Sequence, residues 1–579
     1  MFTNVHFTCQ LFDKLPAENK LLSYILTIFR KKASMINPAK KNIFVLLFIF
    51  SFLHGQAQTT AVPSKPKLIV GIVVDQMAYE FLYRYQDVYG ANGFKKLLKE
   101  GYSCENTHYN YIPTYTGPGH ASIYTGSVPA INGIVSNDWY DRKMNKFMYV
   151  TSDSTVHGVG TPSALSNQSP RNLLSTSICD MLKLSNLQHS KVIGIALKDR
   201  GAILPAGHSA NAAYWYDGSV NSWVTSSFYM DSLPKWVQDY NATKPAEKYL
   251  NQNWNLYLPK ESYRFATADS VSWENVNIGE PGSQFPHYLN FTGNSEIIKG
   301  TPFGNSITRE FAEAILKNEK MGKGNYTDFL CVSFSSTDYV GHGYGPHSVE
   351  MEDTYLRLDN DIAGFIAFLD ATYGKENYLM FLTADHGVSP VPQYLQSLKI
   401  PSGTKTELQM TAEMEAYLDA QLGNKNWIIT YTNQQVYLNE ALLDSMHMEK
   451  EEVFLILHDY VLKMDGVADI FLIDDINDFS YPAGLKEKMI NGIYPKRSGD
   501  IQIIYEPYWF DAYRPTGTTH GSHYAYDTHV PLIWYGWKIK PGVNYSEIFV
   551  TDIAPTLAAL LKISEPNGCV GNVIEGIMK

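Results

Sequence analysis

The sequence has little of several things that would assign it quickly to a class of protein. It contains only five cysteines in 579 residues, and no internal repeat or low-complexity tract is visible. Lysine and arginine number 47 against 58 aspartates and glutamates, which gives a formal net charge of −11. A chain with this acidic balance lacks the basic footprint of a nucleic-acid-binding protein. We therefore expect no nucleic acid partner.

The apolar stretch near the N-terminus is too short for a stable membrane span, which needs roughly 20 residues. It runs from Ile43 to Leu53, after Lys40-Lys41 and before a stretch of small residues that includes Ala57. This order predicts a signal peptide in residues 1–57, cleaved near Ala57, and export to the periplasm. A single membrane anchor is the alternative interpretation.

The start of the chain is open to a second interpretation. Met35 would begin a signal of ordinary length, so residues 1–34 could be an extension that is not translated. No cysteine lies just after the apolar stretch, and a lipidated N-terminus is therefore not expected.

Few cysteines remain after such a cleavage. Loss of Cys9 leaves Cys104, Cys179, Cys331 and Cys569. An exported protein could pair some of them, but the connectivity does not follow from sequence. Cys331 lies inside an apolar run, so we expect it to be a packed thiol.

Three short apolar runs each lead into residues that commonly bind metals. They are Leu68–Val74 before Asp75, Phe329–Phe334 before Asp338 and His342, and Tyr378–Leu382 before Asp385 and His386. Such runs are typical of strands buried on both faces of a mostly parallel sheet. Ligands of these sheets bind outside the carboxyl ends of the strands. The pattern predicts an α/β fold with a metal site at one sheet edge.

Alternating strand-like and helix-like segments suggest how the chain is divided. We expect a catalytic core made of residues 65–200, 304–387 and 511–579. Residues 201–303 are rich in Trp, Tyr, Asn and Pro, as in Tyr214-Trp215-Tyr216, and are expected to form an insertion near the active site rather than more sheet. Residues 388–510 are expected to form a second insertion with amphipathic helices.

Each motif is weak alone, because an aspartate after a strand is often a turn or helix-cap residue. Together with His520, in a Gly-Thr-Thr-His-Gly loop, they supply six carboxylate and imidazole ligands. Six are too many for one catalytic zinc, but they suit two three-ligand sites with open positions. The segment Pro113–Ser122 adds a hydroxyl before a predicted helix start, where free N–H groups favour an anion.

With these motifs the chain resembles the alkaline phosphatase superfamily, and within it the phosphate-irrepressible, threonine-nucleophile alkaline phosphatases of bacteria. The similarity extends from about Lys67 to the C-terminus. It is found in Thr-Gly-Pro-Gly-His at 116–120, the Asp-x-x-x-His pair, Thr-Ala-Asp-His-Gly at 383–387 and Thr-His-Gly-Ser at 519–522. The resemblance implies a large, mostly parallel sheet between helices, with inserted cap segments and two zinc ions at one edge.

The resemblance also implies roles for individual residues. One zinc would be held by Asp75, Asp385 and His386, and the other by Asp338, His342 and His520. The nucleophile would be Thr116, with Thr114 and Ser122 as local competitors. The phosphate would be bound by Asn137, Lys198 and Arg200. His523 is a less favoured metal ligand, and His120 is expected to be structural.

The function implied is that of an exported, monomeric zinc-dependent alkaline phosphatase acting on small-molecule phosphate monoesters through a phosphothreonine. Lys198 and Arg200 favour monoesters, because a diester has an alkyl group on one of the oxygens that they would bind. The sulfatase branch is disfavoured, since its nucleophile is Cys or Ser followed by x-Pro-x-Arg. Two alternatives stay open: a phosphodiesterase or nucleotide pyrophosphatase with the same two-zinc chemistry, and a non-catalytic, zinc-stabilised binding protein.

Overall fold

The three apolar runs that lead into aspartates form adjacent parallel strands. β1 (Leu68–Val74) lies between β9 (Asp328–Phe334) and β10 (Tyr378–Thr383) and pairs in parallel with both. All three are buried along their whole length, as expected for strands covered on both faces. β6 (Val192–Ala196) pairs in parallel with β9. Four strands that precede predicted site residues therefore end at one edge of the sheet.

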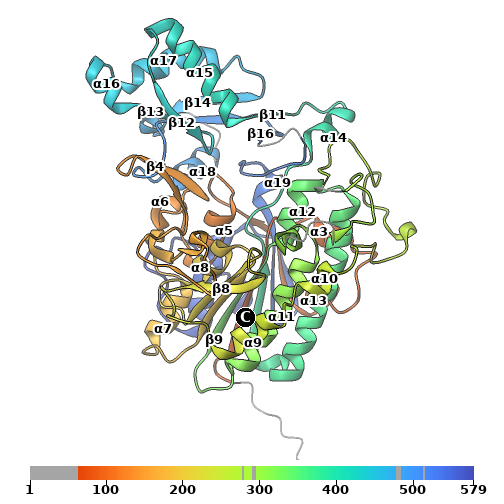
Figure 1. Cartoon of the computed structure of the whole chain (residues 1–579). Coiled ribbons are helices and arrows are strands. Elements are labelled where there is room, and N and C mark those ends of the chain that lie inside the picture. The colour runs from red at the N-terminus through yellow and green to blue at the C-terminus, as the bar shows by residue number, and fades with distance from the viewer. Residues whose placement is uncertain (1–62, 277–279, 290–294, 478–483, 513–515, 579) are drawn as a thin grey trace, which may run out of the picture. The chain divides into compact units, whose positions relative to one another are not determined.

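These strands belong to a mixed sheet in a computed structural model, which describes residues 63–276, 280–289, 295–477, 484–512 and 516–578 (Figure 1). Within them eleven strands follow the order β18-β2-β17-β10-β1-β9-β6-β7-β8-β5, with β19 beside β2. β17 (His529–Gly536) is antiparallel to its neighbours β10 and β2. The remaining strands are β2 (Tyr102–His108), β5 (Gly158–Val159), β7 (Ala212–Asp217), β8 (Ser222–Ser226), β18 (Gly542–Asn544) and β19 (Ile548–Phe549). The predicted signal region, residues 1–57, lies outside the described residues.

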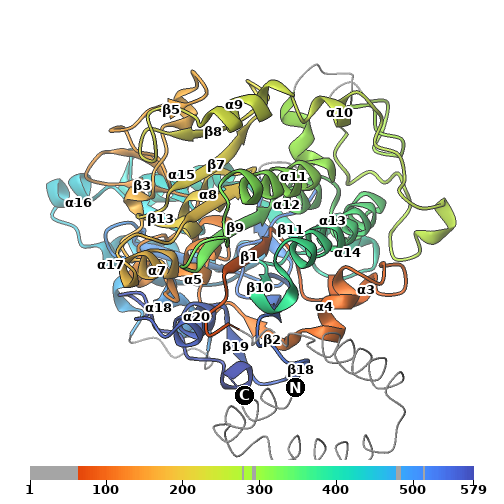
Figure 2. The same ribbon diagram turned by 90° about the horizontal axis from the view of Figure 1, so that it is seen from below.

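Helices cover both faces of the sheet (Figures 1 and 2). On one face are α4 (Phe94–Glu100), α11 (Phe303–Asn318), α12 (Ser336–Tyr344) and α13 (Val349–Tyr373), and on the other α5 (Thr116–Thr125), α7 (Ile178–Ser185), α8 (Asp199–Ala206) and α20 (Ile553–Leu561). Their apolar side chains and those of the sheet form one core. The arrangement confirms the predicted α/β class. Among the described residues, no helix combines the length and apolarity needed to cross a membrane.

Shorter helices and a hairpin connect these layers. The helices are α3 (Phe81–Arg84), α6 (Pro129–Asn132), α9 (Lys235–Ala242), α10 (Glu247–Leu250), α14 (Pro392–Ser397) and α19 (Ala525–Thr528). The hairpin is made by β3 (Asp138–Asp141) and β4 (Lys146–Tyr149), which follow the predicted phosphate-binding Asn137 directly.

Part of the segment predicted as a second insertion builds its own sheet and core. The strands β12 (Ile428–Thr432), β13 (Gln435–Leu438), β15 (Ile501–Tyr505) and β14 (Val467–Leu472) pair antiparallel in that order. The helices of this segment are α15 (Glu407–Leu422), α16 (Glu440–Met446), α17 (Lys450–Val461) and α18 (Leu485–Gly492), and residues from α15, α16 and α17 share one hydrophobic cluster with the strands. β11 (Gly403–Lys405) and β16 (Trp509–Asp511) pair beside it.

The prediction that residues 201–303 add nothing to the sheet is wrong. β7 pairs in parallel with β6, and β8 pairs antiparallel with β7, so the main sheet continues into this segment. The misleading feature was the run Tyr214-Trp215-Tyr216, which lies in β7 and is buried. Aromatic residues favour strands because they pack well on a pleated, covered surface. Here they form a strand of the main sheet instead of a separate insertion.

The cysteines form no disulfide in the described part of the chain. Cys104, Cys179, Cys331 and Cys569 are free, and the first three are buried. Cys331 is a packed thiol in β9, as predicted, with its Sγ 3.7 Å from that of Cys179.

The placement of β8 in the main core predicts a large effect of removing its tryptophan. Trp223 is fully buried and stacks on Phe311 of α11, with ring centroids 4.6 Å apart. Trp223→Ala should lower the free energy of unfolding by about 3–5 kcal/mol, because it leaves a cavity in the core. Denaturant unfolding would show this as a lower midpoint. Exposed Leu187→Ala is the control, and equal midpoints for both variants would contradict the placement of β8.

Candidate active site

Two groups of potential metal ligands gather at the carboxyl ends of the central strands. In the part of the chain that the structure describes, the first metal group is Asp75, Asp385 and His386. The second metal group is Asp338, His342 and His520. Within each group the potential ligand atoms lie within 4.8 Å of one another, and all but His342 are buried. The structure thus brings together the six residues that the sequence predicted as metal ligands.

The local structure explains how the chain places these residues. Asp75 directly follows β1, and Asp385 and His386 follow β10. Asp338 lies in the first turn of α12, with His342 one turn later on the same helix face, which brings His342 Nε2 to 3.1 Å from Asp338 Oδ1. His520 comes from a loop far along the chain, and its ring stacks on that of His386 with centroids 3.5 Å apart.

All three histidines are oriented by their other ring nitrogen. Each Nδ1 lies within hydrogen-bond distance of a backbone carbonyl oxygen: His386 at 2.9 Å from Gly387, His342 at 2.8 Å from Thr518, and His520 at 2.7 Å from Thr114. A donated Nδ1–H leaves Nε2 as the ligand atom, as is usual for histidines that bind metals.

The electrostatics of the site also fit bound cations. Burial, and repulsion from Asp338 and Asp385, raise the pKa of Asp75. Asp75 Oδ1 accepts no hydrogen bond from any described residue. Burial lowers the pKa of His386 and His520, which favours the neutral ring, the form that binds metals. Buried carboxylates with neutral imidazoles are a suitable donor set for zinc.

Thr116 is the first residue of α5 and lies beside the first metal group. Its Oγ1 is 3.5 Å from His386 Nε2, and the side chain is almost fully buried. The next residue, Gly117, donates its backbone N–H to Asn137 Oδ1 at 2.8 Å. Thr116 and Asn137 are therefore held together at a helix N-terminus, where the dipole favours an anion.

The two competing hydroxyls have other surroundings. Thr114 Oγ1 donates to the Ser522 carbonyl at 2.9 Å, and Ser122 is buried further along α5. His120 is also buried, with its two ring nitrogens 2.9 Å from Thr116 O and from Ser333 Oγ. His523 belongs to neither metal group, and its ring packs on Tyr524.

Lys198 bridges the two metal groups. It follows β6 and caps α8, and its Nζ lies 2.7 Å from Asp75 Oδ2 and also donates to Asp338 Oδ2. Burial alone lowers the pKa of Lys198, but attraction by Asp338 and Asp75 outweighs this and the pKa is raised. Arg200 is held by Tyr149, whose hydroxyl lies 3.0 Å from Arg200 Nη1. In this structure the lysine thus offsets part of the negative charge of Asp75 and Asp338.

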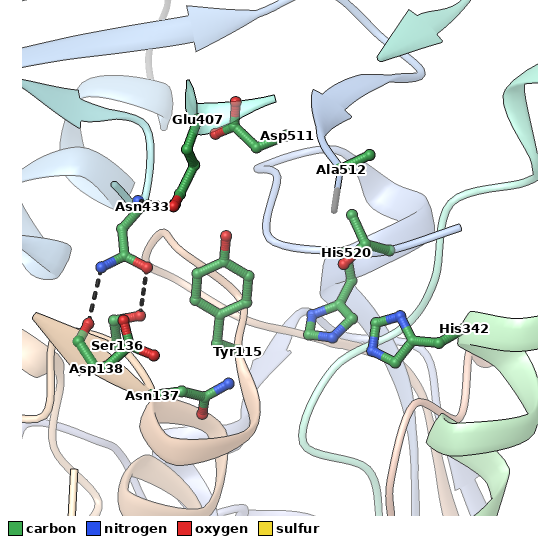
Figure 3. Close-up of a pocket in the computed structure, with 11 residues that line it drawn as sticks. Tyr115, Ser136, Asn137, Asp138, His342, Glu407, Asn433, Asp511, Ala512 and His520 are labelled. Atoms are coloured by element: carbon green, nitrogen blue, oxygen red, sulfur yellow. Dashed lines mark hydrogen bonds between the residues drawn. The ribbon is translucent and has the colours of Figure 1, made fainter. Parts of the chain in front are cut away.

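A pocket of about 120 Å³ opens above the second metal group (Figure 3). Its lining includes His342, His520 and Asn137, and several residues that the sequence did not indicate: Tyr115, Glu407, Asn433 and Asp511 among them. Asp511 accepts a hydrogen bond from Tyr505 at 2.7 Å, and burial raises its pKa to about 7. Thr116, Lys198 and Arg200 lie outside this lining.

Comparison with known proteins assigns the chain to a family. A family model described as type I phosphodiesterase / nucleotide pyrophosphatase matches residues 69–526. The chain belongs to this family. It is part of the alkaline phosphatase superfamily, which confirms the membership predicted from the motifs.

Individual relatives cover almost the whole chain. A Myroides odoratus protein named calcium-transporting ATPase is 46% identical over 517 residues, 88% of this chain and 94% of that protein. Alkaline phosphatase PafA of Elizabethkingia meningoseptica is 44% identical over 552 residues, 94% of this chain and 100% of that protein. The crystal structure of PafA matches with a TM-score of 0.87 over 90% of this chain and 100% of that chain, which confirms the alkaline-phosphatase-like fold.

Proposed function

We propose that this chain is an exported, zinc-dependent alkaline phosphatase that hydrolyses phosphate monoesters through a phosphothreonine intermediate. The observation that supports it most directly is the position of the Thr116 hydroxyl, at a helix N-terminus and 3.5 Å from a histidine of a candidate metal group. The similarity of this chain to PafA, an alkaline phosphatase, extends over 94% of the chain and supports phosphate monoesters as the substrate class. The segment around Lys40 to Gln58 supports export.

Zinc is the cation that the donor set suits best. Asp75, Asp385 and His386 would hold one ion, and Asp338, His342 and His520 the other. Bound there, zinc would supply Lewis acidity that lowers the pKa of a hydroxyl and neutralises charge on phosphate. Lys198 Nζ now lies against Asp75 and Asp338, two of these ligands. For Lys198 to bind a phosphoryl oxygen of the substrate, its Nζ must leave one of these carboxylates.

The protein residues then divide the reaction into two displacements. Thr116 Oγ1 gives up its proton to solvent and attacks phosphorus in line with the alcohol oxygen, so that the Thr116–phosphorus bond forms as the bond to that oxygen breaks. The departing alkoxide takes a proton from water and leaves as the alcohol. Asn137, Lys198 and Arg200 hold the remaining oxygens in place. Water then attacks the phosphothreonine and releases inorganic phosphate. Positioning and charge neutralisation supply most of the acceleration of such phosphoryl transfers.

A second solved structure supports the choice of Thr116, Asn137, Lys198 and Arg200 as reacting and phosphate-binding residues. It is a variant of PafA, with a TM-score of 0.86 and 43% identity, in which a threonine is replaced by serine and an asparagine, a lysine and an arginine by alanine. The replaced threonine and asparagine have the spacing of Thr116 and Asn137. The lysine and arginine are separated by one residue, as Lys198 and Arg200 are.

The family description favours one other function, that of a phosphodiesterase or nucleotide pyrophosphatase. The experiment that decides is a comparison of kcat/KM for a phosphate monoester and its methyl diester with zinc-loaded protein. We expect the monoester to be preferred, because the diester offers one fewer charged oxygen to the two cationic side chains. A preference for the diester would assign the second function instead.

The metal assignment predicts two zinc ions per chain. Chelation should abolish monoester hydrolysis, and added zinc should restore it. Asp338→Asn should weaken the second group, because the amide is a poorer ligand than the carboxylate, and elemental analysis should then find close to one ion. One ion per fully active wild-type chain would contradict the two-site assignment.

The nucleophile assignment predicts different results for two substitutions of Thr116. Thr116→Ser should keep substantial activity, because the hydroxyl remains, whereas Thr116→Ala should lose several orders of magnitude in kcat/KM. Mass spectrometry of acid-quenched enzyme should locate the phosphoryl group on residue 116. Phosphate trapped on Thr114 or Ser122 would show that another hydroxyl attacks.

The cationic side chains predict a change in substrate preference. Lys198→Ala and Arg200→Ala should each slow monoester hydrolysis by about 10²–10³, the usual cost of losing one preorganised charged donor. Diester hydrolysis should fall far less. The two effects need not add, since both residues bind one phosphoryl group. Equal losses on both substrates would assign the pair to folding or general electrostatics.

A further inference from the structure

The second sheet reaches the active site through one hairpin turn. β12 and β13 are joined by Asn433 and Gln434, whose φ angles are 54° and 63°. Positive φ at both central residues is the mark of a type I′ turn, and asparagine adopts this conformation more readily than most residues. Glu407 supports the turn, because its Oε1 accepts a hydrogen bond from Thr432 Oγ1 at 2.8 Å.

The Asn433 side chain makes two hydrogen bonds, one on each side of Asn137 (Figure 3). Its Oδ1 accepts from Ser136 Oγ at 2.7 Å, and its Nδ2 donates to the backbone carbonyl of Asp138 at 2.8 Å. The amide group therefore spans the residue between them. These bonds join segments almost 300 residues apart in the chain.

Asn137 is in turn bonded to the residue after the proposed nucleophile. Its Oδ1 accepts the Gly117 N–H, which leaves its Nδ2 as the donor available to a phosphoryl oxygen. With Oδ1 bonded to Gly117, the direction of Nδ2 also depends on where the backbone of residues 136–138 lies. Asn433 bonds to Ser136 and to Asp138, the residues directly before and after Asn137.

We propose that Asn433 is a positioning residue for phosphoryl transfer and acts by holding Asn137 in place. This inference rests on the proposed function and extends it, because every residue assigned there lies outside the second sheet. Misplacement of a catalytic group by about 1 Å can cost up to about 10²-fold in rate. Asn137 keeps its bond to Gly117 without Asn433, so a smaller loss, of about tenfold, is expected.

The test uses Asn433→Gly in the full-length, zinc-loaded enzyme. Glycine adopts the positive φ of the turn readily and removes the side-chain bonds, and the backbone freedom that it adds is matched in the control variant. Asn221→Gly is the matched control. Asn221 also has a positive φ, of 50°, and accepts a hydrogen bond from Tyr216 at 2.8 Å. Its hydrogen bonds within the described residues involve Tyr216 and Gly218, neither of which is a proposed site residue. Zinc content and thermal unfolding of both variants show whether the fold is kept.

A double-mutant cycle with Asn137→Ala separates positioning from a structural effect. We expect Asn433→Gly to lower kcat/KM for a phosphate monoester about tenfold in the wild-type background and by less than twofold in Asn137→Ala. Asn221→Gly should have little effect in either. No loss in the wild-type background, or the same loss in both backgrounds, would overturn the inference.

Binding of inorganic phosphate provides the same cycle without turnover. Calorimetry should show weaker phosphate binding for Asn433→Gly, and no further weakening once Asn137 is alanine. Absence of monoester hydrolysis by the wild type would overturn the proposed function, while this binding cycle would still decide the role of Asn433. An equal loss of phosphate affinity in both backgrounds would overturn that role.

Discussion

The burial of three carboxylates at one sheet edge is the constraint on which the rest of the site depends. Asp75 and Asp385 are fully buried and Asp338 is only 3% exposed. An ionised carboxylate removed from water without a partner costs several kcal/mol. Lys198 contacts two of the three but brings a single positive charge. The remaining negative charge is what the proposed cations would neutralise, so the metals would stabilise the fold as well as serve the reaction.

The sheet topology produces this concentration of charge. β10, β1 and β9 are adjacent and parallel, so the residues that follow them meet at the same edge. His520 is added by a loop that docks through the Thr518 backbone N–H, which donates to His342 O at 3.2 Å, and through the Thr518 hydroxyl, which donates to Ser389 O. The loop binds beside both metal groups. The second group is therefore complete only when the C-terminal part of the chain has folded onto the sheet.

The central strands and the six metal-binding candidates could be predicted because their signals are local. A run of Val, Ile and Phe followed by aspartate predicts a buried strand, and it also predicts that the aspartate lies at the carboxyl end of that strand. β7 could not be predicted in this way, since Tyr214-Trp215-Tyr216 has no simple alternation. Tyr214 packs on Phe311 of α11, which lies almost 100 residues further along the chain. Glu407, Asn433 and Asp511 lie in or beside the inserted sheet, and their position at the pocket depends on docking between segments far apart in sequence. The turn at Asn433 has a local signal, but its bonds to Ser136 and Asp138 do not.

The direct test of the charge argument is anomalous diffraction at the zinc absorption edge from crystals of the zinc-loaded protein. We expect two peaks, one within bonding distance of Asp75, Asp385 and His386 and the other within bonding distance of Asp338, His342 and His520. Lys198 should have left at least one of its two carboxylates. A single peak would contradict the binding of two zinc ions at these carboxylates. Zinc bound away from both groups, with Lys198 still bridging Asp75 and Asp338, would contradict it as well.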